Sequence, residues 1–188
     1  MSEVVGKFER ASGHFGELVQ QIKDDQWGNA TPCSDWDVRA LVNHLVYEAR
    51  WLPPLLKGET IEQVGSQFDG DLLGADPKTS YDDALGGAAA AIKAPGATEG
   101  IVHLSYGDTP AAEYLGQITT DFLVHSWDLA RGISADDALD PELVPWADDM
   151  ARPQAAMLAA SGLFDPPVDV PSDADPQTKL LALFGRRR

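Results

Sequence analysis

The segment ITTDFLVHSWDLARG, residues 118–132, carries an acid and an imidazole four positions apart in an otherwise apolar stretch. A helix advances about 100° per residue, so Asp121 and His125 lie one turn apart, on the same side as Phe122 and Leu129. An ionised carboxylate buried on that side would be costly without a partner. Residues at this spacing have Cβ atoms about 5–6 Å apart, and the HExxH zinc motif supplies two ligands in the same way. The pair is therefore a candidate for two ligands of one metal ion.

A third candidate ligand lies on another predicted helix. In TPCSDWDVRALVNHLV, residues 31–46, His44 borders the apolar side, and Glu48 follows one turn later. Three protein ligands leave a coordination position open, which is typical of a catalytic rather than a structural zinc site. We predict His44, Asp121 and His125 as metal ligands and Glu48 as a catalytic group.

The sequence is compatible with more than one role for these residues. Glu48 would serve equally as a fourth ligand, as a hydrogen-bond acceptor for a ligand, or as a general base. The competing interpretation of the other residues is a hydrogen-bonded pair of Asp121 and His125 in the core, with His44 unrelated to it. An i, i+4 pair alone is weakly specific, whereas inward-facing polar pairs on two helices favour a site.

Other polar residues are weaker candidates. We expect His103 at the surface or in ordinary packing, and His14 in solvent. Asp69 and Asp71 lack the further oxygen ligands of an EF-hand loop, so they are predicted as loop carboxylates at the rim of a pocket. Cys33 has no histidine at a recognised spacing and is predicted to be structural.

Three residues that follow His125 are assigned supporting contacts. We predict that Asp128 and Arg131 either hydrogen-bond a metal ligand or stabilise the helix end. Trp127 faces away from His125, so we expect it to pack under the C-terminal helices or at a dimer contact.

The helices that would position these residues follow from apolar spacing and end signals. Apolar residues that recur every three or four positions predict a first helix over 3–24. Ser34 and Asp37 match a capping box at the start of the second helix. This helix is expected to run to the residue before Pro53, with a final turn reaching no further than Gly58.

The middle of the chain contains a long connection over residues 59–78, a length that is often functional. A third helix is predicted from Thr79 or Ser80 to Pro95. Residues 100–108 are expected to be partly extended. Thr109 and Pro110 then fit the cap and first position of a fourth helix that ends at Gly132.

The C-terminal third predicts a helix over 140–162, bent near Pro153, and a short helix over 176–184. Together these elements predict an all-α fold, a four-helix bundle with one long crossover connection and extra C-terminal helices. Because one core serves chains of up to about 250 residues, residues 1–188 are expected to form a single domain.

Composition excludes several classes of partner. The chain has 30 acidic and 14 basic residues and a net charge of −16, which repels nucleic acid and anionic lipid. No apolar run reaches the roughly 18 residues of a membrane span, and the N-terminus lacks a signal-peptide pattern. A single cysteine allows no internal disulfide, so we expect a cytoplasmic protein.

Several stretches resemble a known family. TPCSDWDVRALVNHLV, FDGDLLGADP (68–77), TTDFLVHSWDLARG (119–132) and LLALFGR (180–186) together resemble the actinobacterial maleylpyruvate isomerase-like, mycothiol-dependent family. This family lies within the DinB-like superfamily of metal-dependent bundles. The two histidine-bearing stretches occur in the family's order, and the resemblance spans most of the chain.

The resemblance implies a DinB-like four-helix fold with a divalent metal, usually zinc, held by His44, Asp121 and His125. Characterised isomerases of the family commonly use glutamate as the acidic ligand, so the shorter Asp121 is a departure that bears on metal choice. The implied co-substrate is mycothiol, and superfamily members often form homodimers.

Three functional hypotheses follow. The leading one is a metal-dependent enzyme in which mycothiol transfers sulfur to a small electrophile or isomerises it, with the metal stabilising the thiolate. The second keeps the metal but activates water, as a hydrolase or lyase. The third is a non-catalytic bundle that binds a small apolar ligand, with Tyr47 and Trp51 near its mouth.

Overall fold

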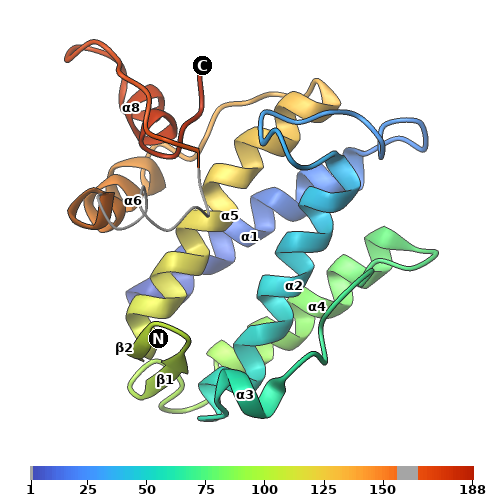
Figure 1. The fold of residues 1–188 in the computed structure, drawn as a ribbon, viewed down its shortest axis with the longest axis vertical. Coiled ribbons are helices and arrows are strands. Elements are labelled where there is room, and N and C mark those ends of the chain that lie inside the picture. The colour runs from blue at the N-terminus through green and yellow to red at the C-terminus, as the bar shows by residue number, and fades with distance from the viewer. Residues whose placement is uncertain (1, 156–164) are drawn as a thin grey trace.

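The computed structural model describes residues 2–155 and 165–188. Its centre is a bundle of four helices (Figure 1), in which the first packs on the third and fourth, and the second packs on the same two. The predicted four-helix architecture is therefore confirmed. The four helices are α1 (Glu3–Gln21), α2 (Val38–Leu56), α4 (Pro77–Ile92) and α5 (Ala111–Ile133).

Aromatic side chains fix α1 against α5. Phe122 of α5 contacts Phe8 and Phe15 of α1 edge to face, with ring centroids 5.5 and 5.8 Å apart. All three rings are buried, and such pairs prefer this edge-to-face geometry. Because Phe122 directly follows Asp121, this packing also sets the rotation of α5 about its axis and turns Asp121 towards α2.

The start of α2 differs from the prediction. Asp37 is itself the N-cap and accepts a hydrogen bond from the backbone N–H of Ala40 at 2.8 Å, so the capping box based on Ser34 is wrong. Ala30 and Asp37 form an isolated antiparallel bridge, which holds the preceding residues in a loop. The final turn after Pro53 is confirmed, since the fixed φ of proline is compatible with helix.

The long connection between α2 and α4 is partly helical. It contains α3 (Ile61–Val64), which begins with a capping box between Thr60 and Gln63 that our sequence analysis missed. The helix α4 starts earlier than predicted, at Pro77, because Asp76 caps it by accepting from the backbone N–H of Thr79.

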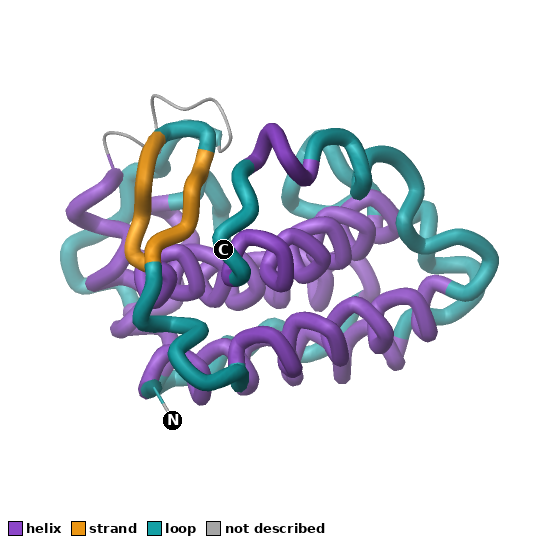
Figure 2. Tube along the Cα trace, turned by 90° about the horizontal axis from the view of Figure 1, so that it is seen from below, coloured by secondary structure: helices purple, strands orange, loops and turns teal. Residues whose placement is uncertain are grey.

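A short hairpin interrupts the helical pattern (Figure 2). The extended segment predicted near 100–108 is confirmed as β1 (Ile101–Leu104), which pairs antiparallel with β2 (Gly107–Pro110). The prediction that Thr109 and Pro110 begin a helix is wrong: Thr109 pairs with Val102, and α5 begins one residue after Pro110. Over residues 2–155 and 165–188 the fold is all-α apart from this hairpin.

The C-terminal helices lie on one side of α5 (Figure 1). The first, α6 (Leu143–Ala151), packs on α5 and continues into a 3₁₀ turn at Arg152–Gln154, and α8 (Pro176–Leu183) packs on α6. The helix predicted over 140–162 therefore begins three residues late, and its last part lies outside the described residues. Across the described helices, none has the length and apolar character of a membrane span.

Candidate metal centre

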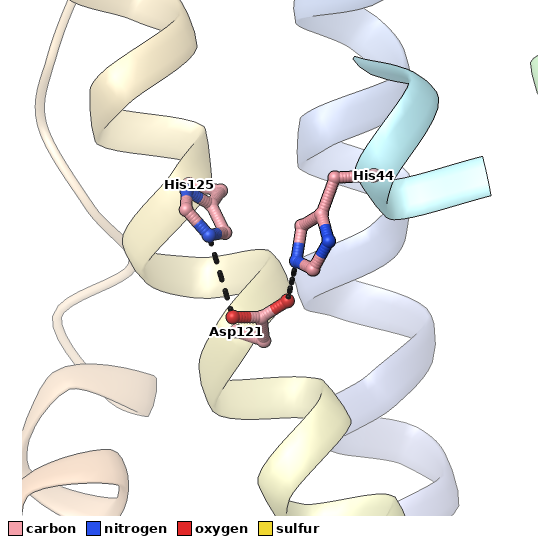
Figure 3. Close-up of side chains that lie close together, drawn as sticks. All are labelled: His44, Asp121 and His125. Atoms are coloured by element: carbon pink, nitrogen blue, oxygen red, sulfur yellow. Dashed lines mark hydrogen bonds and ion pairs between the residues drawn. The ribbon is translucent and has the colours of Figure 1, made fainter. Parts of the chain in front are cut away.

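Three predicted ligands meet between α2 and α5 (Figure 3). His44 Nε2 lies 2.9 Å from one carboxylate oxygen of Asp121, and His125 Nε2 lies 3.4 Å from the other. One potential ligand atom from each of the three residues falls within 4.8 Å of the other two. The alternative in which His44 is unrelated to the pair on α5 is therefore wrong.

The three side chains differ in burial. His125 is 2% exposed, whereas the side chains of His44 and Asp121 are 23% and 16% exposed. The site is thus closed at its His125 end and accessible from one side. This combination suits a centre that must exclude bulk water and still admit a reactant.

Trp36 covers the two imidazoles, a role that the sequence analysis missed. Its ring lies 4.5 Å from the ring of His44, at an interplanar angle of 31°, and 5.4 Å from the ring of His125. The carbonyl of Trp36 accepts a hydrogen bond from the Thr31 hydroxyl at 2.8 Å. A tryptophan directly before the helix cap Asp37 was the available signal.

Asp128 contacts the far side of His125. Its carboxylate accepts a hydrogen bond from Nδ1 of His125 at 2.9 Å and forms an ion pair with Arg186 at 2.8 Å. The contact predicted between Asp128 and a candidate ligand is present. Arg131 instead pairs with Asp137 at 3.3 Å, at the end of the helix.

The charges of these groups shift one another's pKa values. Burial opposes the charge of the Asp121 carboxylate, but the two adjacent imidazoles outweigh this and hold its pKa below the ordinary value. Burial likewise disfavours the charged form of His125, yet Asp121 and Asp128 outweigh it and raise the pKa of His125 to about 9. At neutral pH His125 therefore carries a proton beside the ionised Asp121, and a metal ion bound through its Nε2 would have to displace that proton.

We expect the metal-free protein to lose stability as pH rises from about 6.5 to about 9. Folded His125 keeps its proton in that interval while the unfolded chain, with a pKa of 6.5, releases it. The contribution of His125 to the free energy of unfolding is therefore complete below pH 6.5 and disappears as the pH passes the folded pKa. Over this interval the free energy of unfolding should fall by up to about 1 kcal/mol per pH unit. Denaturant unfolding in the presence of chelator at several pH values measures it.

The control for this pH effect is His14, whose side chain is 34% exposed. His125→Gln should flatten the profile between pH 7 and 9, whereas His14→Gln should leave the wild-type slope. Parallel profiles for the wild type and His125→Gln would show that another group carries the effect.

A pocket of about 580 Å³ opens onto the site. Its wall includes the tip of the hairpin, where Tyr106 is 62% exposed and donates a hydrogen bond from its hydroxyl to Gln117 at 2.6 Å. Tyr47 and Trp51, expected near the mouth, also line it. The lining residues are Cys33, Asp35, Trp36, His44, Tyr47, Glu48, Trp51, Leu55, Ile61, Leu104, Ser105, Tyr106, Tyr114, Gln117, Ile118, Asp121, His125 and Arg186.

Glu48 lies in the wall of this pocket but not in the group of three. Burial, followed by the nearby charge of Asp121, raises the pKa of its carboxyl to about 7. A carboxyl that exchanges a proton near neutral pH is suited to general acid–base work. This placement favours the general-base alternative over a fourth ligand.

The weaker candidates lie elsewhere or in supporting positions. His103 is half-exposed and hydrogen-bonds Asp108 at 2.7 Å, so the prediction of a surface histidine is confirmed. Asp69 lines a smaller hollow of about 350 Å³ that also borders His44, which agrees with a position at a pocket rim. Cys33 lines the main pocket, and burial raises the pKa of its thiol, which lowers its reactivity.

Asp71 and Trp127 have structural contacts. Asp71 pairs with Arg39 at 2.9 Å, tying the crossover connection to α2. Trp127 is buried, at 1% exposure, and the guanidinium of Arg131 lies 5.9 Å from its ring. Neither residue belongs to the group of candidate ligands.

The donor set fits a divalent metal. Two imidazole nitrogens and one carboxylate oxygen are ligands that zinc accepts. Asp121 contacts both imidazoles through separate oxygens, at 2.9 and 3.4 Å, so the three donor groups converge on one place. Asp128 gives His125 the outer hydrogen bond that metal-binding histidines almost always have.

Comparison with known proteins extends these observations. Residues 8–130 match the family model of the mycothiol maleylpyruvate isomerase N-terminal domain. Two uncharacterized proteins of Mycobacterium tuberculosis, from strains CDC 1551 / Oshkosh and ATCC 25618 / H37Rv, are each 33% identical over 142 residues. Each alignment covers 72% of this chain and 70% of the relative.

Solved structures show the same fold. A crystal structure of the mycothiol-dependent maleylpyruvate isomerase superposes with a TM-score of 0.60 at 17% identity, and a single-residue mutant of that enzyme gives 0.64 at 16%. Both cover 92% of this chain and 77% of the other. The chain therefore belongs to the mycothiol maleylpyruvate isomerase N-terminal domain family.

Proposed function

We propose that this protein is a metal-dependent enzyme in which mycothiol attacks a small electrophile, giving an S-conjugate or an isomer. The observation that carries the proposal is the meeting of His44, Asp121 and His125 at one side of a pocket that also contains Glu48. Membership of the family supports mycothiol as the thiol and maleylpyruvate as the first electrophile to test.

His44, Asp121 and His125 would hold the metal, for which zinc is our first candidate because of the two imidazoles. Three protein ligands would leave a position for the thiol sulfur, and a bound divalent cation favours thiolate over thiol at neutral pH. Trp36, whose ring lies against both imidazoles, would keep bulk water from that side of the site.

Glu48 would move the proton. Glu48 lines the same pocket, and burial raises the pKa of its carboxyl to about 7 in the metal-free protein. A carboxyl in this position would accept the thiol proton and return it to the product. The thiolate would then form a bond to one carbon of an activated double bond. Rotation about the resulting single bond, followed by loss of the thiolate, yields the isomer, whereas protonation of the adduct yields the conjugate.

The pocket would hold both reactants. Its volume of about 580 Å³ lies within the usual range for small-molecule sites. Tyr47, Trp51 and Tyr114 give it an aromatic wall, and Gln117 adds an amide that can hydrogen-bond a hydroxyl or carboxylate group of a reactant.

The test is a reaction that requires both thiol and metal. Protein loaded with one equivalent of zinc is mixed with mycothiol and maleylpyruvate, and chromatography with mass spectrometry follows isomer and conjugate. We expect product above the protein-free rate only when thiol, zinc and protein are all present. A small panel of other electrophiles, assayed identically, would reveal a different electrophile preference.

The remaining outcomes separate the alternatives. Turnover that persists without thiol would point to activated water, and turnover that persists in chelator would contradict the proposed use of a metal. A protein purified without metal but with an organic molecule in the pocket would favour the non-catalytic binding bundle.

A further inference from the structure

Asp128 is a fully buried carboxylate enclosed between a candidate ligand and the end of the chain. Its side chain is 0% exposed, and that of Arg186 is 2% exposed. On one side Asp128 accepts from Nδ1 of His125 at 2.9 Å, and on the other it accepts from two nitrogens of Arg186 at 2.8 and 3.2 Å. These contacts form a continuous buried chain from the C-terminal residues to the imidazole.

The direction of each hydrogen bond has a consequence for His125. A carboxylate can only accept, so Nδ1 must carry the hydrogen in its contact with Asp128. The other ring nitrogen, Nε2, then faces Asp121 and His44 with its lone pair available when the ring is neutral. The tautomer fixed by Asp128 is the one that ligation through Nε2 requires.

Arg186 makes the buried charge of Asp128 tolerable. A carboxylate at this depth without a cation would be costly, and Arg186 supplies Nε and Nη2 to it while donating Nη1 to the carbonyl of Phe184 at 2.7 Å. The guanidinium fork thereby holds the carboxylate in one orientation.

The backbone conformation at Gly185, directly before Arg186, helps to place the guanidinium. Gly185 has φ +82°, a conformation that favours glycine. A Cβ on Gly185 would lie 2.8 Å from the carbonyl oxygen of Asp165, so a larger residue would push the tail away. The position of the guanidinium is thus set by a close backbone approach.

We propose that Asp128 and Arg186 are positioning residues that prepare His125 as a metal ligand, and that the C-terminal tail is therefore part of the metal centre. This inference rests on the proposed function, since it concerns the same metal. It adds a residue that lies well beyond the family match at residues 8–130, joined to the site by a buried ion pair.

The test compares zinc affinity in four variants, measured by competition with a chromogenic chelator at fixed pH. Asp128→Asn and Arg186→Met should each bind zinc about 10–100-fold more weakly than the wild type, the range for loss of an outer partner of a ligand. The double variant should bind no more weakly than Asp128→Asn alone, because both residues act through one contact. Arg186→Lys should fall between Arg186→Met and the wild type.

Arg188→Met is the matched control. Arg188 lies two residues further along the same tail and forms an exposed ion pair with Asp175 at 3.1 Å, so its loss removes an arginine without touching Asp128. We expect its zinc affinity to stay within twofold of wild type. If Arg186→Met fails to fold because it leaves Asp128 unpaired, Asp128→Asn and the double variant still carry the comparison.

A second readout separates positioning from general stability. In the zinc-loaded wild type, ¹H–¹⁵N spectra of the histidine side chains should show a slowly exchanging Nδ1–H for His125, and Asp128→Asn should broaden or shift it. Wild-type affinity and an unchanged signal in Asp128→Asn would overturn this inference alone. A wild-type protein that binds no zinc would instead overturn the proposed function together with it.

Discussion

Replacement of His125 with alanine is expected to remove the metal from the protein. His125 is the most buried of the three candidate ligands, and its Nε2 lies 3.4 Å from Asp121. Two ligands on different helices would remain, and the cavity left by the imidazole would admit water. We expect zinc affinity to fall by more than the roughly 100-fold that loss of an outer partner causes, and turnover to fall to the protein-free rate.

The measurement is the zinc content of purified protein, with a chelator titration for the residual affinity. His103→Ala is the control, because His103 is half-exposed and hydrogen-bonds Asp108 on the hairpin. That variant should retain about one zinc per chain. His125→Ala protein that also retains stoichiometric zinc would rule out the proposed ligand set.

Replacement of Glu48 with glutamine is expected to reduce turnover by about 10²–10⁴-fold while leaving zinc content unchanged. A glutamine side chain has the shape of glutamate but cannot gain or lose a proton near neutral pH. General acid–base catalysis contributes about this factor, and Glu48 lies in the pocket wall outside the group of three ligands. The two readouts together distinguish its possible roles.

Steady-state assays with mycothiol and maleylpyruvate provide the rates, and elemental analysis provides the zinc content. Glu59→Gln is the matched control, since Glu59 is an exposed carboxylate shortly after the same helix ends. A loss of zinc in Glu48→Gln would identify Glu48 as a fourth ligand. A rate within tenfold of wild type would exclude Glu48 as the proton carrier.

The candidate ligands could be predicted because helical geometry is regular. The spacing of Asp121 and His125 fixes their common face in any straight helix, and His44 borders the apolar side of its own helix by the same reasoning. Their approach across two helices also required the long-range packing of α2 on α5, which spacing alone does not give. The family resemblance supplied that missing information.

Sequence reasoning missed Arg186 and Trp36 because the contact of each depends on the folded path of the backbone. Arg186 reaches Asp128 across 58 positions, and no periodic pattern relates a tail residue to a helix so far away. Trp36 reaches His44 because of a loop conformation, which depends on hydrogen bonds such as that from the Thr31 hydroxyl. Such contacts follow from tertiary structure and leave little trace in local sequence.

Errors at element ends have local causes. Ser34 and Asp37 match a capping pattern, yet Asp37 caps the helix directly, because both residue types are good caps and only the backbone path decides between them. At residues 107–110, cross-strand pairing with residues 101–104 overrides the tendency of Thr-Pro to begin a helix. Both errors shift a boundary and leave the bundle intact.

The hairpin and the helix bundle contribute different parts of the candidate site: the hairpin shapes the pocket, and the bundle carries the candidate metal ligands. Its tip contributes Leu104, Ser105 and Tyr106 to the pocket, whereas His44, Asp121 and His125 come from the bundle. A change of length or sequence at the tip would reshape the space available to a reactant without repacking α2 against α5. If the proposed function holds, exchange of these few residues for those of a relative should change which electrophile is accepted and leave the metal ligands unchanged.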